Sequence, residues 1–230
     1  MSAALHAENL TVKLRETNAG IVSGVSFSLC AGGALALVGD SGSGKTMCVN
    51  AILGLLNKRI FNTSGIARFA GENLLTMPEH ALRRIRGDKI ALIPQNPMTA
   101  FDPGFKIGTQ ITETIRAHRR LTRRAARTLS SDALDALGLP DSLTRSYPHT
   151  LSGGMLQRAA IALALIMEPE IVIADEATTA LDVVNRRIVL DELIKLKSRG
   201  SALLLITHNP REAEYCSCET IYIGERKNED

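Results

Sequence analysis

The chain has 230 residues, of which 45% are hydrophobic and 22% are charged. This length is enough for one large domain or two small ones, and the composition excludes a disordered, collagen-like or coiled-coil protein. Lys and Arg outnumber Asp and Glu by 27 to 24. That surplus is too small to indicate nucleic acid or an anionic membrane as a partner.

The chain shows no targeting signal. Its N-terminal segment contains an acid, Glu8, and lacks the basic-then-apolar order of a signal peptide. The most apolar stretch, Ala159 to Met167, has about half the length of a membrane-spanning helix. The four cysteines form no C-x-x-C pair, so free thiols are predicted, with Cys216 and Cys218 as an alternative redox or ligand pair. These features predict a globular protein of the cytosol.

Strands and helices alternate in the first part of the chain. Val25 to Leu29 alternates polar and apolar residues, which predicts a half-buried strand, and the apolar run Ala34–Val38 predicts a strand covered on both faces. Helical spacing follows over about Lys45 to Leu56. Next come a strand and hairpin turn over 65–73, a capping box at Thr76–Glu79 with a helix to about Arg86, and a strand at Ile90–Ile93.

The region from about residue 104 to 150 is polar, Arg-rich and helical in pattern, with stop signals at Gly138 and Pro140. Afterwards the alternation returns, with strands at 171–174, 202–207 and 220–223 and helices at 183–197 and from Pro210. Short buried strands between helices predict an α/β fold with a parallel sheet and right-handed crossovers. We expect a small antiparallel β part near the N-terminus and a helical subdomain inserted at about 104–155.

One motif predicts a phosphate site. The loop between the predicted strand at 34–38 and the following helix has the pattern G-x-x-x-x-G-K-[ST], in the context that the motif requires. Its members are Gly39, Asp40, Ser41, Gly42, Ser43, Gly44, Lys45 and Thr46. Glycines let the backbone approach phosphates, whose charge is favourable at a helix N-terminus. Lys45 is expected to reach the β- and γ-phosphates, and the Thr46 hydroxyl to hold Mg²⁺.

Polar residues follow three of the predicted buried strands. Asp175 and Glu176 end one strand, His208 ends another, and Gln95 lies just past a third. Open α/β sheets bind ligands at this edge, so Asp175 can bind Mg²⁺ through water and Glu176 can orient or deprotonate an attacking water. Taken alone, His208 would be a structural hydrogen-bonding residue and Gln95 an ordinary loop residue.

The segment Leu151-Ser152-Gly153-Gly154-Met155-Leu156-Gln157-Arg158 lies between the phosphate loop and the Asp-Glu strand. It resembles the signature motif of ATP-binding-cassette (ABC) ATPases. The resemblance extends over about residues 5 to 223 and includes a glutamine loop at Gln95, Ala180-Leu181-Asp182, and a switch histidine at His208. It implies a single ABC nucleotide-binding domain over residues 1–230 with a P-loop NTPase core, whose cofactors are ATP and Mg²⁺.

The resemblance also implies a division of roles. Glu176 would polarise water, His208 would stabilise the γ-phosphate, and Gln95 would complete the Mg²⁺ shell and sense a membrane partner. Two ATP molecules would be sandwiched in a head-to-tail dimer. Ser152, Gly153 and Gly154 would face the ATP held by the other subunit, and Asp182 would link the two sites.

Two further strings resemble the nickel, dipeptide and oligopeptide importers of bacteria: Gln95 to Pro103, and Tyr147 to Leu151. Met155 favours the nickel-type subunit, with peptide import as the alternative. The implied partners are a second ABC ATPase subunit, identical or different, two membrane permeases and an extracytoplasmic binding protein, without nucleic acid. The implied location is the cytoplasmic face of the inner membrane, reached through the permeases.

Two departures from the family are visible. No aromatic residue that could stack on adenine occurs between Val12 and Gly24, so Arg15, Leu14 or Ile21 would have to substitute, and selectivity for adenine is expected to be loose. Many subunits of the peptide branch continue with a cysteine-bearing C-terminal segment. The sequence ends without one, and we expect no regulatory domain.

Six arginines occur within twelve residues, at positions 116, 119, 120, 123, 124 and 127. The prediction is a solvated helix face, and contact with anionic headgroups or a permease loop is the alternative. Two rival functions for the whole chain remain: a soluble ABC ATPase outside transport, and a degenerate module that binds ATP but hydrolyses it poorly. The presence of Lys45, Asp175, Glu176 and His208 argues against the degenerate module.

Overall fold

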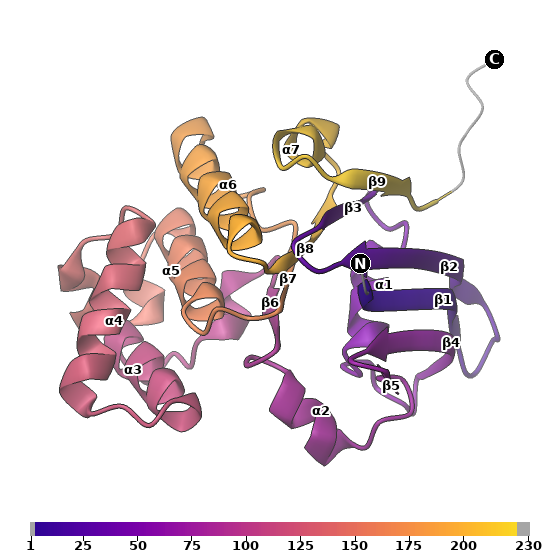
Figure 1. Ribbon diagram of the computed structural model, residues 1–230, viewed down its shortest axis with the longest axis horizontal. Coiled ribbons are helices and arrows are strands. Elements are labelled where there is room, and N and C mark those ends of the chain that lie inside the picture. The colour runs from indigo at the N-terminus through magenta and orange to yellow at the C-terminus, as the bar shows by residue number, and fades with distance from the viewer. Residues whose placement is uncertain (1–2, 225–230) are drawn as a thin grey trace.

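The computed structural model describes residues 3–224. An antiparallel sheet and a parallel sheet lie side by side, and helices cover the parallel sheet (Figure 1). The antiparallel sheet has the order β2-β1-β4-β5. Its strands are β1 (Ala3–Leu14), β2 (Gly20–Cys30), β4 (Phe61–Phe69) and β5 (Glu72–Asn73).

Strand β1 is not among the strands predicted from sequence, because its alternation changes phase. Leu5 and Ala7 are buried, and so are Leu10 and Val12, but Leu10 follows Ala7 by three positions, which breaks the period of two. The pairing register of β1 with β2 shifts between Ala7 and Leu10, where Asn9 has φ +50°. An irregularity of this kind lets one strand keep both pairs on the core side.

The parallel sheet matches the predicted α/β class. Its order is β6-β7-β8-β3-β9, and all four neighbouring pairs are parallel. The strands are β3 (Ala34–Val38), β6 (Ile90–Ile93), β7 (Ile171–Asp175), β8 (Ala202–Thr207) and β9 (Glu219–Tyr222). The uninterrupted apolar runs have a direct cause, since Leu35 and Leu37 enter one core whereas Ala36 and Val38 enter the other.

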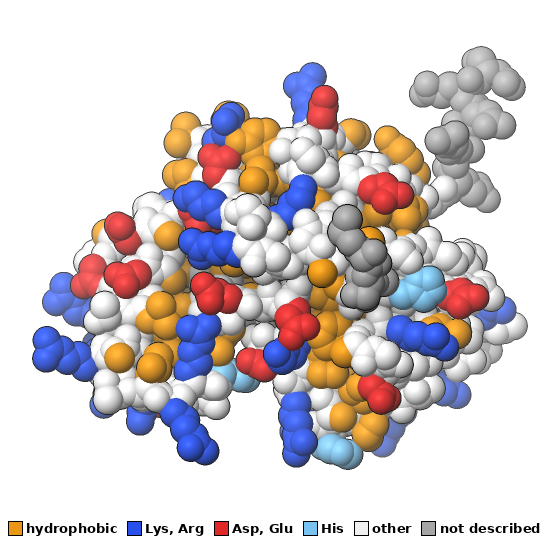
Figure 2. Space-filling view, viewed as in Figure 1, with side chains coloured by type: hydrophobic (Ala, Val, Ile, Leu, Met, Phe, Trp, Pro, Cys, Tyr) orange, Lys and Arg blue, Asp and Glu red, His pale blue; other side chains and the backbone are white. Residues whose placement is uncertain are grey.

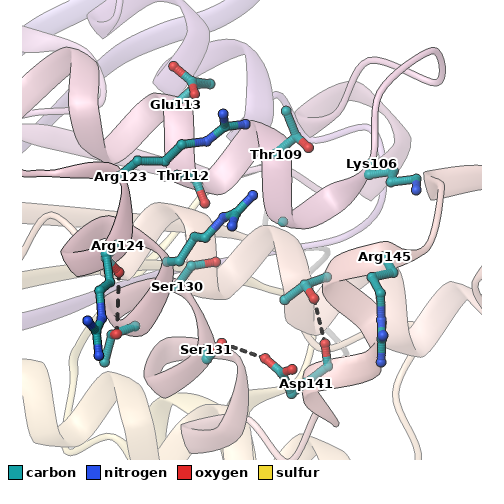
Figure 3. A pocket seen from close by; sticks show the side chains of 14 residues that line it. Lys106, Thr109, Thr112, Glu113, Arg123, Arg124, Ser130, Ser131, Asp141 and Arg145 are labelled. Atoms are coloured by element: carbon teal, nitrogen blue, oxygen red, sulfur yellow. Dashed lines mark hydrogen bonds between the residues drawn. The ribbon is translucent and has the colours of Figure 1, made fainter.

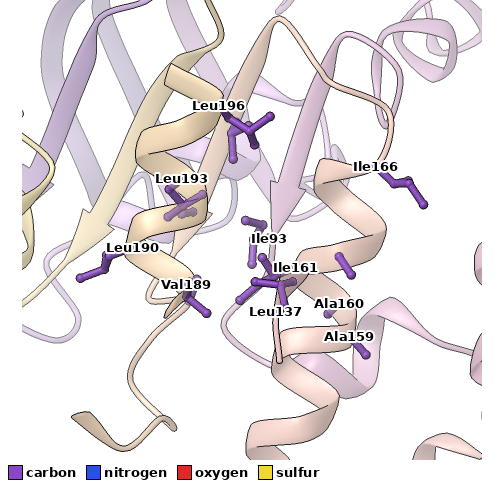
Figure 4. Packing of buried hydrophobic residues seen from close by; sticks show 14 of the residues in the cluster. Ile93, Leu137, Ala159, Ala160, Ile161, Ile166, Val189, Leu190, Leu193 and Leu196 are labelled. Atoms are coloured by element: carbon purple, nitrogen blue, oxygen red, sulfur yellow. The ribbon is translucent and has the colours of Figure 1, made fainter. Parts of the chain in front are cut away.

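Seven α-helices and three 3-10 turns occur in the described part of the chain. The α-helices are α1 (Lys45–Ile52), α2 (Glu79–Ile85), α3 (Ile107–His118), α4 (Arg123–Ala136), α5 (Gly153–Leu165), α6 (Val183–Ser198) and α7 (Pro210–Tyr215). The 3-10 turns are η1 (Pro97–Ala100), η2 (Asp141–Arg145) and η3 (Pro148–Thr150). Helices α5 and α6 pack on the sheet through Ile161, Val189 and Leu193, next to Ile93 of β6 (Figure 4).

Two local predictions were wrong. Helix α1 ends at Ile52 instead of continuing to about Leu56, because Gly54 adopts φ +64° and the chain turns there. Helix α2 has no capping box: Thr76 Oγ1 donates to the Asn73 carbonyl in the preceding turn (3.2 Å), and no side chain caps the helix at Pro78. The carboxylate of Glu79 is bound by Arg83 and Arg86 instead of the backbone.

Helices α3, α4 and α5 occupy the interval between β6 and β7, on the left of Figure 1. Gly138, at φ +66°, ends the turn after α4, and the Arg158 guanidinium binds the carbonyls of Leu137 and Gly138 at 2.9 and 3.1 Å. The Arg-rich run does not form one helix face, since it covers the end of α3, a connecting segment and the start of α4. Within 3–224, no helix combines the length and apolar character needed to cross a membrane.

Candidate functional site

The predicted phosphate loop connects β3 to α1 at the carboxyl edge of the parallel sheet. Two of its glycines are required by close backbone contacts. A Cβ on Gly39 would lie 2.1 Å from the Ile223 carbonyl oxygen. Gly44 has φ +92°, and its Cβ would lie 2.7 Å from the Ile21 carbonyl oxygen. The loop is therefore clamped at both ends between β9 and β2, with a shape that other residues could not adopt without strain.

The centre of this loop has the features of an anion site. Helix α1 begins after Gly44 with neither a capping side chain nor an acidic residue in its first turn, so its first amide groups are left without an acceptor. Nothing lies within 4 Å of where a Cβ on Gly42 would stand. The buried ammonium of Lys45 donates to the carbonyls of Gly39 and Asp40 at 2.7 and 2.6 Å. These groups fit a phosphate chain.

A hydroxyl and a carboxylate meet beside the loop. Thr46 Oγ1 donates to Asp175 Oδ1 at 3.1 Å. Burial raises the pKa of Asp175, the hydrogen bond from Thr46 lowers it, and the charge of Glu176 raises it further. Residues 3–224 contain no cluster of three or more His, Cys, Asp or Glu side chains suited to a metal. Two oxygen donors fit Mg²⁺, which typically takes one or two protein ligands and completes its shell with phosphates and water.

Three residues far apart in sequence meet at Glu176, directly after β7. Gln95 Nε2 donates to Glu176 Oε2 at 2.9 Å, and His208 Nδ1 lies 3.7 Å from Glu176 Oε1. The Glu176 backbone has φ +46°, a conformation that non-glycine residues seldom adopt, and its N–H donates to the Ile206 carbonyl at 2.9 Å. The structure thus brings together Gln95, Glu176 and His208 from the ends of β6, β7 and β8.

The segment Ser152–Gly154 lies at the start of α5. Ser152 is the N-cap, and its side chain accepts a hydrogen bond from the Met155 amide at 3.3 Å. A Cβ on Gly153 would meet nothing within 4 Å, so the helix end is open to solvent at that residue. Among the described residues, no hydrogen bond joins this segment to the phosphate loop. The two predicted phosphate-facing elements of one chain are thus not bonded to each other within the described residues.

Asp182 is the N-cap of α6, and no hydrogen bond or ion pair joins it to Gln95, Glu176 or His208 among the described residues. Its carboxylate accepts from the Asn185 amide at 2.9 Å, and the hydrogen bonds from Asn185 lower its pKa. The two residues that follow, Val183 and Val184, are 78% and 70% exposed. The start of α6 therefore carries two adjacent exposed apolar side chains.

Sequence reasoning missed a buried carboxylate behind the site. Glu212 on α7 accepts hydrogen bonds from Thr178 (2.7 Å) and from Thr207 (2.8 Å), and Arg186 Nε lies 3.6 Å from it. Thr178 follows Glu176 by two residues, and Thr207 immediately precedes His208. Glu212 therefore links the two loops that carry the predicted catalytic residues. In the sequence, Glu212 is an acid next to Ala213 in the helix predicted from Pro210. That pattern does not distinguish it from an exposed, solvated residue.

Gln157 is a second missed residue. It is 1% exposed on α5, and its Nε2 donates to the Pro94 carbonyl at 3.3 Å. This bond connects the helix that begins at Ser152 with the loop that carries Gln95. Among the predicted substitutes for an adenine-stacking ring, Arg15 is held in place by a hydrogen bond from its Nε to the Lys58 carbonyl at 2.7 Å.

Comparisons with known proteins identify the fold and the family. The dimeric ABC transporter cassette MJ0796 superposes with a TM-score of 0.85 at 26% identity, covering 95% of this chain and 94% of the other, and its dimer bound to ADP and Pi gives the same values. The parallel sheet, the phosphate loop and the antiparallel sheet thus define an ABC ATPase fold. The ABC transporter family profile matches residues 22–179. The chain belongs to the ABC transporter family.

Relatives in bacteria refine this assignment. The oligopeptide transport ATP-binding protein OppD of Escherichia coli is 39% identical over 214 residues, which cover 90% of this chain and 63% of OppD. The dipeptide transport ATP-binding protein DppD of Lactococcus lactis is 41% identical over 212 residues, which cover 89% and 60%. The chain spans about six tenths of the length of these relatives. Their names favour the peptide alternative over the expected nickel-type subunit.

Proposed function

We propose that residues 1–230 form a single ABC nucleotide-binding domain that binds ATP with Mg²⁺ and hydrolyses it to drive import through membrane permeases. The observation that carries this proposal is the meeting of Gln95, Glu176 and His208 at the carboxyl edge of the sheet that also holds the phosphate loop. A chain retaining only a binding role would not require a carboxylate fixed between an amide and an imidazole beside that loop.

The phosphate chain of ATP would lie along Gly39–Thr46. Lys45 would exchange its contacts with the Gly39 and Asp40 carbonyls for the β- and γ-phosphates, because its ammonium already lies within the loop. Thr46 and Asp175 would hold Mg²⁺, and Gln95 would complete the shell. The ion supplies charge neutralisation of the phosphates when bound.

Glu176 would orient and polarise the attacking water. Its position is over-determined, since its backbone is bound to Ile206 and its two oxygens face Gln95 and His208. His208, on the other side of the carboxylate, would stabilise charge on the γ-phosphate. Phosphoryl transfer depends mainly on positioning and charge stabilisation, which this arrangement provides.

The second half of each site would come from a second ABC ATPase subunit, identical or different. Ser152–Gly154 is open to solvent at Gly153, as expected of a segment that faces another subunit's ATP. The exposed Val183 and Val184 beside Asp182 would then be covered in the dimer. The remaining partners would be two permeases at the cytoplasmic face of the membrane and an extracytoplasmic binding protein, with peptides as the transported class.

The test of catalysis is Glu176→Gln in the assembled complex. We expect ATP turnover to be lost while ATP binding remains, because the substitution removes the charge that polarises water and leaves the phosphate loop unchanged. Lys45→Ala is expected to weaken nucleotide binding itself. The matched control is Glu170→Gln, an exposed acid paired with Lys89. Unchanged steady-state hydrolysis by Glu176→Gln would contradict the role given to Glu176.

The test of the partners is a gentle affinity purification from native membranes followed by mass spectrometry. Two polytopic permeases and a second ABC ATPase are the expected companions. Uptake of labelled oligopeptides and of nickel into vesicles holding that complex then separates the two substrate classes. Co-purification of ribosomal or other soluble proteins instead of permeases would contradict the transport function and leave the proposed ATPase chemistry unaffected.

A further inference from the structure

A large cavity lies in the helical region, away from the phosphate loop. It is formed by α3, α4 and η2, and its volume is about 890 Å³. Apart from Gly108, every lining residue carries a charge or a hydroxyl group. No aromatic or aliphatic residue lines the cavity, so its side chains suit a polar, charged molecule better than an apolar one.

The charge of this cavity is positive. Five cationic side chains line it: Lys106, Arg123, Arg124, Arg127 and Arg145. None of the four arginines forms an ion pair within residues 3–224. Two acids also line the cavity, and the five cations outnumber them: Glu113 is paired with Arg116, outside the lining, and Asp141 accepts a hydrogen bond from Ser131, inside it. In Figure 2, cationic side chains accumulate along the edge of the molecule that α3 and α4 form.

The floor of the cavity holds a polar group that lacks a partner. Ser130, on α4, is 1% exposed, and its Oγ makes no hydrogen bond to any described residue. Thr112, on α3, is 3% exposed and also lines the cavity. Figure 3 shows Thr112 and Ser130 lying on the two helices that face each other across it. Buried hydroxyls are normally hydrogen-bonded, and leaving one without a partner is unfavourable, which points to a ligand as the missing partner.

We propose that this cavity binds the phosphate groups of a phosphorylated ligand, which is either a soluble molecule or a lipid headgroup. Guanidinium groups match phosphate oxygens in bidentate geometry, and Ser and Thr hydroxyls donate to the oxygens that remain. The cavity is larger than a single phosphate requires, which favours a ligand with more than one phosphate or a phosphate on a polar carrier. This site is separate from the proposed nucleotide site and belongs to the helical region alone.

The test is calorimetric titration of the full chain with inorganic tripolyphosphate at physiological salt, with saturating Mg-ADP present to occupy the nucleotide loop. Binding at one site is expected. Arg127→Gln and Arg145→Gln should each weaken it about tenfold, the effect of losing a charge-assisted hydrogen bond. The matched control is Arg120→Gln, which removes the same charge from the same run at a residue outside the lining and should leave the affinity within about twofold.

Ser130→Ala distinguishes a binding role from a structural one. It should weaken tripolyphosphate binding several-fold while leaving the unfolding temperature equal or higher, because it removes an unsatisfied buried hydroxyl. Co-sedimentation with vesicles of phosphatidylglycerol in phosphatidylcholine identifies the source of the phosphate. Vesicle binding that depends on Arg127 and is displaced by tripolyphosphate indicates a lipid headgroup, and tripolyphosphate binding without vesicle binding indicates a soluble ligand.

Two kinds of result would overturn the proposal. One is the absence of saturable tripolyphosphate binding, or an equal loss of affinity in Arg120→Gln and Arg127→Gln. The other is normal tripolyphosphate affinity in the cavity variants together with failure to assemble with permeases, which would make an acidic protein segment the occupant.

Discussion

Removing the Glu212 carboxylate should strongly destabilise the fold. Glu212→Ala deprives two buried hydroxyls, those of Thr178 and Thr207, of their acceptor and leaves Arg186 without its nearby carboxylate. A hydrogen bond to a charged group contributes about 1.5–3 kcal/mol, so the two bonds predict a loss of about 3–6 kcal/mol. That is a large part of the roughly 5–15 kcal/mol that stabilises a typical domain. Glu212→Gln, which keeps one acceptor oxygen, should lose about half as much.

The assay is equilibrium unfolding in urea, with the free energy extrapolated to water at constant slope. Glu214→Ala is the matched control: it removes an exposed acid from the same helix and should change stability by less than about 0.5 kcal/mol. A double-mutant cycle between Glu212→Ala and Thr207→Val should give a coupling energy of about 1–3 kcal/mol. A loss below about 1 kcal/mol in Glu212→Ala, or no coupling to Thr207, would refute the assignment of this network.

The remaining predictions concern the phosphate loop and its neighbours. Burial raises the pKa of Asp175, so the folded chain binds the proton of this carboxyl group more tightly than the unfolded chain does. The free energy of unfolding therefore falls as the pH rises from the unfolded to the folded pKa of this group. Asp175→Asn should therefore raise the thermal unfolding midpoint of the nucleotide-free chain at pH 7, and the difference from the unaltered chain should shrink toward pH 4. The same variant should lose Mg²⁺-dependent ATP turnover. A lower unfolding midpoint at pH 7 would disprove this account. Gly39→Ala should lower the free energy of unfolding by about 1–3 kcal/mol, because its Cβ would meet the Ile223 carbonyl. Gly153→Ala lies at an open helical position and should leave the free energy of unfolding unchanged or slightly higher. It should impair ATP hydrolysis only in the assembled dimer. Equal unfolding curves for these two variants would contradict the clamp on the loop. GTP should compete with ATP to a measurable extent, since the segment before the loop offers no aromatic ring and Arg15 is bound to Lys58; strong discrimination against GTP would count against loose adenine selectivity.

Local patterns in the sequence were sufficient for most of the parallel sheet. Strand β3 and strand β8 have the predicted bounds, because an uninterrupted apolar run between turn residues allows few other structures. The phosphate loop was also predictable, since its glycines and lysine act within one short segment. The predicted capping box at Thr76 was wrong, because the Thr76 hydroxyl donates to the Asn73 carbonyl in the preceding turn. Backbone geometry decides between such competing local acceptors, and the sequence pattern does not show it.

The sequence by itself determined the class of fold, the loop, and the strand ends that carry Gln95, Glu176 and His208. Only the tertiary structure decided which of these side chains meet, because their distances depend on the order of strands in the sheet and not on their separation along the chain. The same holds for Glu212 and Ser130, whose importance comes from burial. Glu212 accepts hydrogen bonds from two buried hydroxyls, and the buried Ser130 hydroxyl has no partner among the described residues. In the sequence both look like ordinary polar residues, because their surroundings exist only once the helices are packed.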